Sequence, residues 1–189
     1  GLDIDQISGG DGVDTIYGGS DGDIIDGGDE RDTIYGDAED PDNGTVTGDD
    51  TIYGGKGGDT IFGGRGADKL YGEDDADTIK GGKGEDLIVG GKGADTLLDG
   101  GDDGDRIYGD DEDPSANAGD ADTILGGAGD DKIYAGGGAD VSVDGEAGND
   151  LIVGGFGADV LHGGENDDEI YGGLQDIDDT QDASADQLF

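Results

Sequence analysis

Gly81–Leu98 reads GGKGEDLIV followed directly by GGKGADTLL, so two nine-residue units stand in tandem. Each unit has glycine at positions 1, 2 and 4, aspartate at position 6 and a large aliphatic residue at position 8. Copies and variants of this unit fill nearly the whole chain. A repeat of fixed length is typical of a stacked architecture in which every copy packs against its neighbours.

The composition is strongly acidic. The 189 residues include 51 acidic and 9 basic side chains, which gives a formal net charge of -42, and only 30% of the residues are hydrophobic. Such a balance is typical of a disordered chain. Because the repeat is too regular for plain disorder, we expect a chain that stays unfolded until something neutralises its charge.

The same composition excludes several partners. Nucleic acid and anionic membrane surfaces require a basic face, which this sequence lacks. No apolar run reaches membrane-spanning length, and the opening GLDIDQIS has neither the basic nor the apolar region of a signal peptide. Cysteine is absent, so a disulfide or a thiolate metal site is excluded.

The spacing within a unit predicts a short strand and a turn. Asp-x-Ile-x fits a three- or four-residue strand with position 8 facing inward and position 9 outward. The preceding glycine-rich hexapeptide fits a turn. Two units then make one circuit, and circuits stack as parallel strands. The predicted fold is all-β, a parallel β-roll or two-sided β-solenoid, forming a single domain over 1–189 with acidic loop inserts near 37–47, 110–118 and 174–184.

Some units depart from the pattern. Aligned from the first glycine, Asp99 and Asp144 are extra residues after position 9, and Ser142 falls at position 8, where it leaves a gap in the apolar column. Ala135 replaces a first glycine, so we expect a local irregularity between Ala135 and Asp144.

Position 4 is not glycine in five units, which carry Asp21, Glu30, Asp75, Asp103 and Asn166 there. Aspartate and asparagine tolerate left-handed backbone geometry, whereas Glu30 is expected to be strained.

The position-6 aspartates predict a metal requirement. One aliphatic side chain per nine residues makes a thin core, too small to offset the backbone entropy lost on folding. Stacking also places these aspartates in a column along each edge, where bare carboxylates repel. Ca²⁺ suits them, since it takes six to eight oxygens from carboxylates and backbone carbonyls, while Mg²⁺ demands tighter geometry. Zinc is disfavoured because the chain has one histidine and no cysteine.

The unit resembles the G-G-x-G-x-D-x-U-x nonapeptide of the RTX (repeats-in-toxin) family, along essentially the entire chain. The resemblance implies a β-roll with multiple Ca²⁺ ions held between successive turns on the same side. It also implies a secreted, extracellular or cell-surface protein that is unfolded at low calcium and folds outside the cell. The ligands it implies are Asp5, Asp14, Asp23, Asp32, Asp50, Asp59, Asp68, Asp77, Asp86, Asp95, Asp105, Asp122, Asp131, Asp140, Asp150, Asp159, Asp168 and Asp186. Asp5 and Asp186 are terminal members, each without a partner turn on one side.

Two interpretations remain open for the acidic Asp-Pro inserts. They are either solvent-exposed loops or a source of extra Ca²⁺ ligands from Asp37, Asp40, Asp110 or Asp113.

Three functions remain open as well. The first is a calcium-responsive structural module, and the second is the repeat region of a secreted enzyme or toxin whose catalytic domain lies elsewhere. The third is a self-assembling filament or surface-layer subunit, a homo-oligomer formed by end-to-end stacking of solenoids. No catalytic residue is predicted, since His162 falls at an outward position 9. The tyrosines at position 9 are predicted to stack on their neighbours, and Tyr53, Tyr71, Tyr108, Tyr134 and Tyr171 to share one face.

Overall fold

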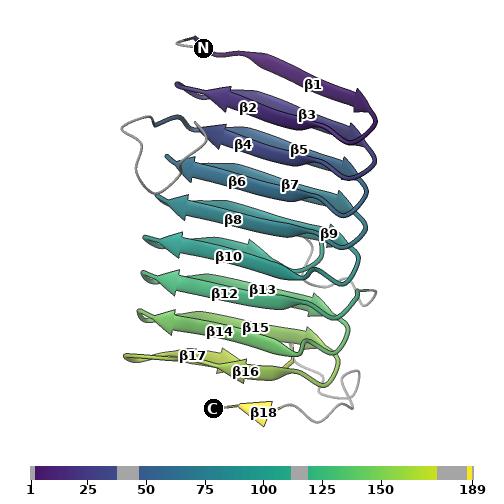
Figure 1. Ribbon diagram of the computed structural model, residues 1–189. Coiled ribbons are helices and arrows are strands. Elements are labelled where there is room, and N and C mark those ends of the chain that lie inside the picture. The colour runs from purple at the N-terminus through teal and green to yellow at the C-terminus, as the bar shows by residue number, and fades with distance from the viewer. Residues whose placement is uncertain (1–2, 38–46, 112–118, 174–186, 189) are drawn as a thin grey trace.

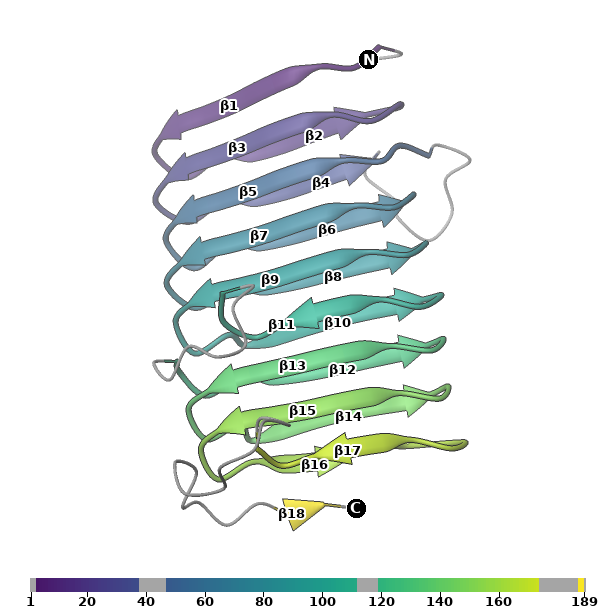
Figure 2. The ribbon, with the colours of Figure 1, turned by 180° about the vertical axis from the view of Figure 1, so that it is seen from behind.

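The computed structural model describes residues 3–37, 47–111, 119–173 and 187–188. Over these residues the chain forms two nine-stranded sheets in which neighbouring strands are parallel, and no helix is present. The described residues therefore contain no helix that is long and apolar enough to cross a membrane. The chain passes to the opposite sheet at each turn, so odd- and even-numbered strands form separate sheets (Figures 1 and 2). The predicted all-β, two-sided β-solenoid is confirmed.

The two sheets are named here by their strand numbers. The odd sheet contains, in spatial order, β1 (Gln6–Asp11), β3 (Ile24–Asp29), β5 (Thr51–Lys56), β7 (Lys69–Asp74), β9 (Leu87–Lys92), β11 (Arg106–Tyr108), β13 (Lys132–Gly137), β15 (Leu151–Phe156) and β17 (Glu169–Tyr171). The even sheet contains β2 (Thr15–Gly19), β4 (Thr33–Asp37), β6 (Thr60–Arg65), β8 (Thr78–Lys83), β10 (Leu97–Asp102), β12 (Thr123–Ala128), β14 (Ser142–Ala147), β16 (Val160–His162) and β18 (Gln187–Leu188).

The core is the column of position-8 side chains between the sheets. Ile52, Leu70 and Ile88 are paired in register on the odd sheet and are fully buried. Ile61 and Ile79 face them from the even sheet and are equally buried. Successive side chains of a strand point to opposite faces, so positions 7 and 9 point outward. In the regular units, this confirms the prediction that position 8 faces inward and position 9 faces outward.

The strands are longer than the spacing predicted. In β9, for example, the six strand residues run from position 7 through the glycine pair to position 3 of the next unit, and residues on both sides of the first glycine are paired. The turn is therefore confined to about positions 4 to 6. Gly91, at position 2, keeps its place in the ladder with a φ of 107°, a value that side chains rarely adopt. The glycine pair thus belongs to the strand rather than to the turn.

The alignment around the single-residue insertions was wrong. Leu98, not Leu97, pairs with Ile79 and is fully buried. Val143, not Ser142, pairs with Ile124 and is fully buried, so the apolar column has no gap there. The extra residue is accommodated between the position-6 aspartate and the strand, because the strand register is fixed by whichever aliphatic side chain reaches the interior. The irregularity expected near Ala135 lies at Val141, whose exposed fraction is 63%.

Candidate metal centre

The position-6 aspartates form two columns, one along each edge of the solenoid, as the repeat spacing predicted. The column that precedes the odd strands contains Asp5, Asp23, Asp50, Asp68, Asp86, Asp105, Asp131, Asp150 and Asp168. The column that precedes the even strands contains Asp14, Asp32, Asp59, Asp77, Asp95, Asp122, Asp140 and Asp159. Asp186 lies outside the described residues.

Each column is held together by hydrogen bonds between consecutive circuits. The backbone N–H of Asp68 donates to Oδ1 of Asp86, and the N–H of Asp86 donates to Oδ1 of Asp105, both at 2.8 Å. The backbone carbonyl of Asp68 meanwhile accepts from the N–H of Leu87 at 2.9 Å. One carboxylate oxygen of each aspartate is therefore used to fix the side chain against the preceding turn.

The second carboxylate oxygen of most column aspartates has no hydrogen-bond partner among the described residues. Fourteen column aspartates are almost fully buried, with exposed fractions of 0–3%. The Oδ2 atoms of thirteen of these, and that of Asp14, are buried without a hydrogen bond: Asp14, Asp23, Asp32, Asp50, Asp59, Asp68, Asp77, Asp86, Asp95, Asp105, Asp122, Asp131, Asp140 and Asp150. A buried carboxylate oxygen left unpaired costs free energy, and a repeated row of them requires a ligand.

The first glycine of a regular unit leaves room for this oxygen. A Cβ added at Gly81 would overlap Oδ2 of Asp86 and also the carbonyl oxygen of Gly100 in the next circuit. The φ of Gly81 is not in the left-handed region, so the requirement here is space and not backbone freedom. The glycine thus brings a carboxylate oxygen and a backbone carbonyl oxygen close together in each turn.

Burial raises the pKa of the column carboxyls. For Asp86, burial is the largest cause, the hydrogen bond to the Asp68 backbone opposes it, and the negative charges of Asp68 and Asp105 add to the rise in pKa. The pKa is raised to about 7 for Asp68, Asp95 and Asp131, and to about 8 for Asp77, Asp86, Asp105, Asp122 and Asp140. Without a cation, these side chains would hold protons near neutral pH.

We expect the calcium-free protein to fold more readily in acid. A raised carboxyl pKa means that the folded state binds protons which the unfolded chain releases, so this stability is present below pH 4 and is lost as pH rises through 6 to 8. Circular dichroism of protein freed of calcium should therefore show more β structure at pH 5.5 than at pH 8. Equal β content at the two pH values would contradict this expectation.

The non-glycine residues at position 4 take the geometry that the sequence predicted. Asp21, Asp75, Asp103 and Asn166 have φ values of 68°, 78°, 78° and 86°, and Glu30 has 76°. Oε2 of Glu30 accepts a hydrogen bond from the N–H of a glycine one circuit back, at 2.7 Å. Two further positive values were not predicted and fall at position 2 of their units, at Glu73 (79°) and Glu146 (67°).

The four insert aspartates fall into two groups. Asp40 and Asp113 lie outside the described residues. Asp37 and Asp110 are buried, with exposed fractions of 5% and 6%, so these two are not part of a solvent-exposed loop. Near the ends of the solenoid, Asp5, Asp14 and Asp168 are partly exposed.

The donor set fits a hard cation held largely by backbone oxygens. No three aspartate, glutamate, histidine or cysteine side chains gather as a metal-binding cluster in the described residues. An ion in a turn would therefore draw on the unpaired Oδ2 atoms together with backbone carbonyls such as that of Gly100. Ca²⁺ accepts this mixture of ligands, with six to eight oxygens in flexible geometry. The residues present fit calcium.

The outer faces carry stacked aromatic rings, as predicted. Tyr53 and Tyr71 stack at 5.0 Å between ring centroids on the odd sheet, and Tyr17 and Tyr35 stack at 4.9 Å on the even sheet. The five tyrosines predicted to share a face all lie in odd strands: Tyr53, Tyr71, Tyr108, Tyr134 and Tyr171. His162 lies on the even sheet, paired with Asp144.

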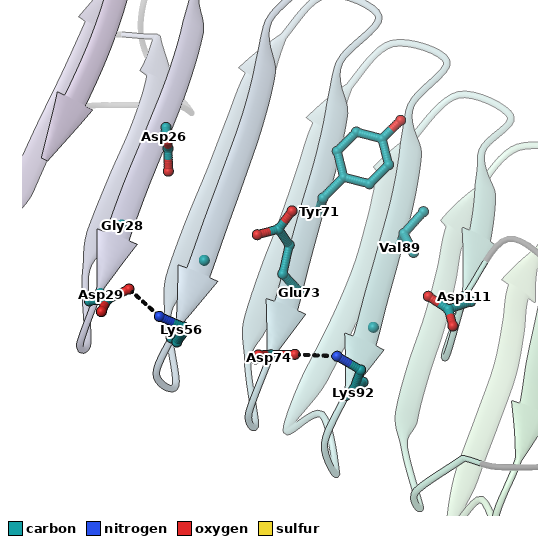
Figure 3. A pocket seen from close by; sticks show the side chains of 12 residues that line it. Asp26, Gly28, Asp29, Lys56, Tyr71, Glu73, Asp74, Val89, Lys92 and Asp111 are labelled. Carbon is teal, nitrogen blue, oxygen red and sulfur yellow. Dashed lines mark hydrogen bonds and ion pairs between the residues drawn. The ribbon is translucent and has the colours of Figure 1, made fainter. Parts of the chain in front are cut away.

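An open groove on the odd sheet is lined by exposed charges (Figure 3). Lys56 pairs with Asp29 at 2.7 Å, and Lys92 pairs with Asp74 at 2.6 Å, while the ring of Tyr71 lies farther along β7. Exposed ion pairs of this kind contribute little free energy. We therefore assign the groove to the solvated surface and the binding chemistry to the buried columns.

A parallel β-solenoid with rows of buried, unpaired carboxylate oxygens defines a class of cation-binding repeat protein. The sequence matches the family described as the RTX calcium-binding nonapeptide repeat over residues 1–34, 45–79, 62–97, 81–113, 118–142 and 144–176. The chain belongs to this family, whose repeats bind calcium in general. Neither the curated proteins nor the solved structures provide a match to the chain.

Proposed function

We propose that the chain is an extracellular calcium-binding module that folds when calcium binds and then acts structurally, without catalysing a reaction. The ions would lie along both edges, and the position-6 aspartates would supply their carboxylate ligands. Such a module serves equally well alone or as the repeat region of a larger secreted enzyme or toxin.

The observation that supports this proposal most strongly is the row of buried Oδ2 atoms without partners. Fourteen almost fully buried carboxylates, most of them spaced one circuit apart, repel one another unless cations lie between them. Weak calcium affinities, with dissociation constants of about 10⁻⁴–10⁻³ M, are typical of extracellular modules. If the sites of this chain have such affinities, the fold forms only where calcium reaches these concentrations, as it does outside the cell.

Substitution of the column aspartates tests the proposal. Asp86→Ala and Asp95→Ala, one in each column, should each lower the calcium stoichiometry measured by isothermal titration calorimetry. At calcium about a hundredfold above Kd, each lost site should remove about 3 kcal/mol of the free energy of unfolding. Asp26→Ala removes the same charge from an exposed position on the outer face and serves as the control. Titrations of both column variants that match the control would refute the ligand role.

Calcium-dependent self-assembly is a second candidate. The apolar column reaches both ends of the described solenoid, where Ile7 and Ile170 are only partly buried against the core. In the isolated 189-residue polypeptide, these ends would offer strand edges and apolar surface to another copy. Light scattering with added calcium should then show growing particles, and a persistent monomer at high concentration would exclude assembly.

A further inference from the structure

Two buried aspartates outside the columns, Asp37 and Asp110, stand at position 2 of the units that carry the first two inserts. In regular units this position is usually a glycine with positive φ, such as Gly64 (117°) and Gly136 (106°). Among the described residues with positive φ, neither aspartate is found. The backbone therefore leaves the regular turn at these two residues.

In a regular unit, the backbone carbonyl of position 2 accepts a hydrogen bond from the position-3 N–H of the next circuit. The carbonyl of Glu146, for example, accepts from the N–H of Glu165 at 2.6 Å. The same oxygen also lies close to the position-2 Cα of that circuit: the carbonyl of Gly82 occupies the space where a Cβ of Gly101 would be. An insert that redirects the backbone removes this oxygen from the turn.

At both inserts, an aspartate side chain takes the place of that carbonyl. The N–H of Arg65, at position 3 of the next circuit, donates to Oδ2 of Asp37 at 2.8 Å. The N–H of Gly137, at the equivalent position, donates to Oδ2 of Asp110 at 2.6 Å. The two Oδ2 atoms also occupy the space where a Cβ of Gly64 or of Gly136 would be. The hydrogen-bond donor and the neighbouring glycine are thus the same as in a regular turn.

The substitution brings an additional charge into the turn. Oδ1 of Asp37 is buried and has no hydrogen-bond partner among the described residues. Asp37 follows Gly36, where an added Cβ would overlap Oδ2 of the column residue Asp50. On the opposite edge, Asp110 follows Gly109, where an added Cβ would overlap Oδ2 of Asp122. The Asp110 carboxylate also accepts a backbone hydrogen bond from Asp120. Each insert therefore places a buried carboxylate beside its aspartate column.

The arginine beside Asp37 does not account for this arrangement. Arg65 lowers the pKa of Asp37, but burial has the larger effect and raises it. At the second insert, Gly137 stands in the place of Arg65, and a buried aspartate is present nonetheless. The feature common to both turns is the lost carbonyl oxygen, not a basic neighbour.

We propose that Asp37 and Asp110 are calcium ligands that replace a backbone carbonyl wherever an insert interrupts the solenoid. The inference rests on the proposed function and extends it to residues outside position 6, and Asp37 lies outside every range that matches the family. A carboxylate at this point gives an interrupted turn both the acceptor for the next circuit and an oxygen for the ion.

Asparagine variants of the full 189-residue chain separate these two tasks. Asp37→Asn and Asp110→Asn keep an oxygen that can accept the hydrogen bond but remove the charge. We expect each to lose one bound calcium ion, or to weaken one site about tenfold or more, by equilibrium dialysis and calorimetry, and the double variant to lose two. Asp26→Asn is the exposed control. An unchanged calcium titration of both folded asparagine variants would overturn the inference, whereas a wild-type chain that binds no calcium would refute the proposed function itself.

A shortened chain keeps the test decisive if the single variants do not fold. Deleting residues 38–46 joins Asp37 to Thr47, and Asp37→Gly then gives the regular unit GGTGDDTIY. Because a backbone carbonyl returns to the turn, this chain should bind as many ions as the wild type, while Asp37→Gly with the insert present should bind one fewer. Equal ion counts for Asp37→Gly with and without the insert would also overturn the inference.

Discussion

Removal of calcium at pH 8 is expected to convert the protein from β structure to an unfolded chain. The apolar core receives about one aliphatic side chain from each strand, and the carboxylates beside it are buried in rows about one circuit apart. Without a cation these carboxylates must either repel one another or take up protons, and their pKa values of about 7 and 8 place proton uptake below pH 8. Circular dichroism should show coil with chelator present and β structure when millimolar calcium is restored.

The comparison with magnesium is the control for this experiment. Mg²⁺ at the same concentration supplies equal charge screening, but it demands octahedral geometry and retains its waters. We therefore expect magnesium to restore much less β structure than calcium. β structure that survives complete removal of divalent ions at pH 8 would contradict the account.

The second large effect is expected at the corrected strand register. Leu98 is fully buried in the column, whereas Leu97 is partly exposed on the outer face. Leu98→Ala should lower the free energy of unfolding in saturating calcium by about 2–5 kcal/mol, because it removes buried methyl groups and leaves a cavity. Leu97→Ala should cost about 1 kcal/mol or less. Denaturant titrations of the two variants give the comparison directly.

A matched pair in another unit checks the same register. Val143 is fully buried, and Val141 has an exposed fraction of 63%. Val143→Ala should therefore lower the free energy of unfolding more than Val141→Ala does. If Leu97 proved more sensitive than Leu98, and Val143→Ala cost no more than Val141→Ala, the extra residues would lie after the strands, where the simple alignment placed them.

Most of the solenoid could be predicted because the nine-residue repeat determines both the apolar core and the aspartate columns. Position 8 sets the core, and position 6 sets the columns, so Ile88 and Asp86 could be placed from spacing alone. The register after an insertion could not be predicted from spacing, since Leu97 and Leu98 are equally apolar and an extra residue fits on either side of a strand. Three-dimensional packing decides this by which leucine reaches the interior.

The repeat also leaves the roles of Asp37 and Asp110 open, since it offers them only as two of four candidate ligands in the inserts. Each looks like the first residue of an acidic loop, and only the structure shows its carboxylate directed back at the next circuit. One sequence signal was available: both units read Gly-Asp immediately before an insert, where regular units usually read Gly-Gly. A charged residue at position 2 is not sufficient by itself, because Glu73 and Glu146 keep positive φ there; the signal is the combination of Gly-Asp with the insert that follows it.

The central claim is that calcium occupies the turns beside the buried carboxylates, and anomalous diffraction from crystals grown in calcium tests it most directly. The account predicts anomalous peaks along both edges, about 2.3–2.6 Å from Oδ2 atoms of column aspartates such as Asp68, Asp86 and Asp95. Peaks confined to the outer faces, or turns without ions in a folded protein at saturating calcium, would contradict it.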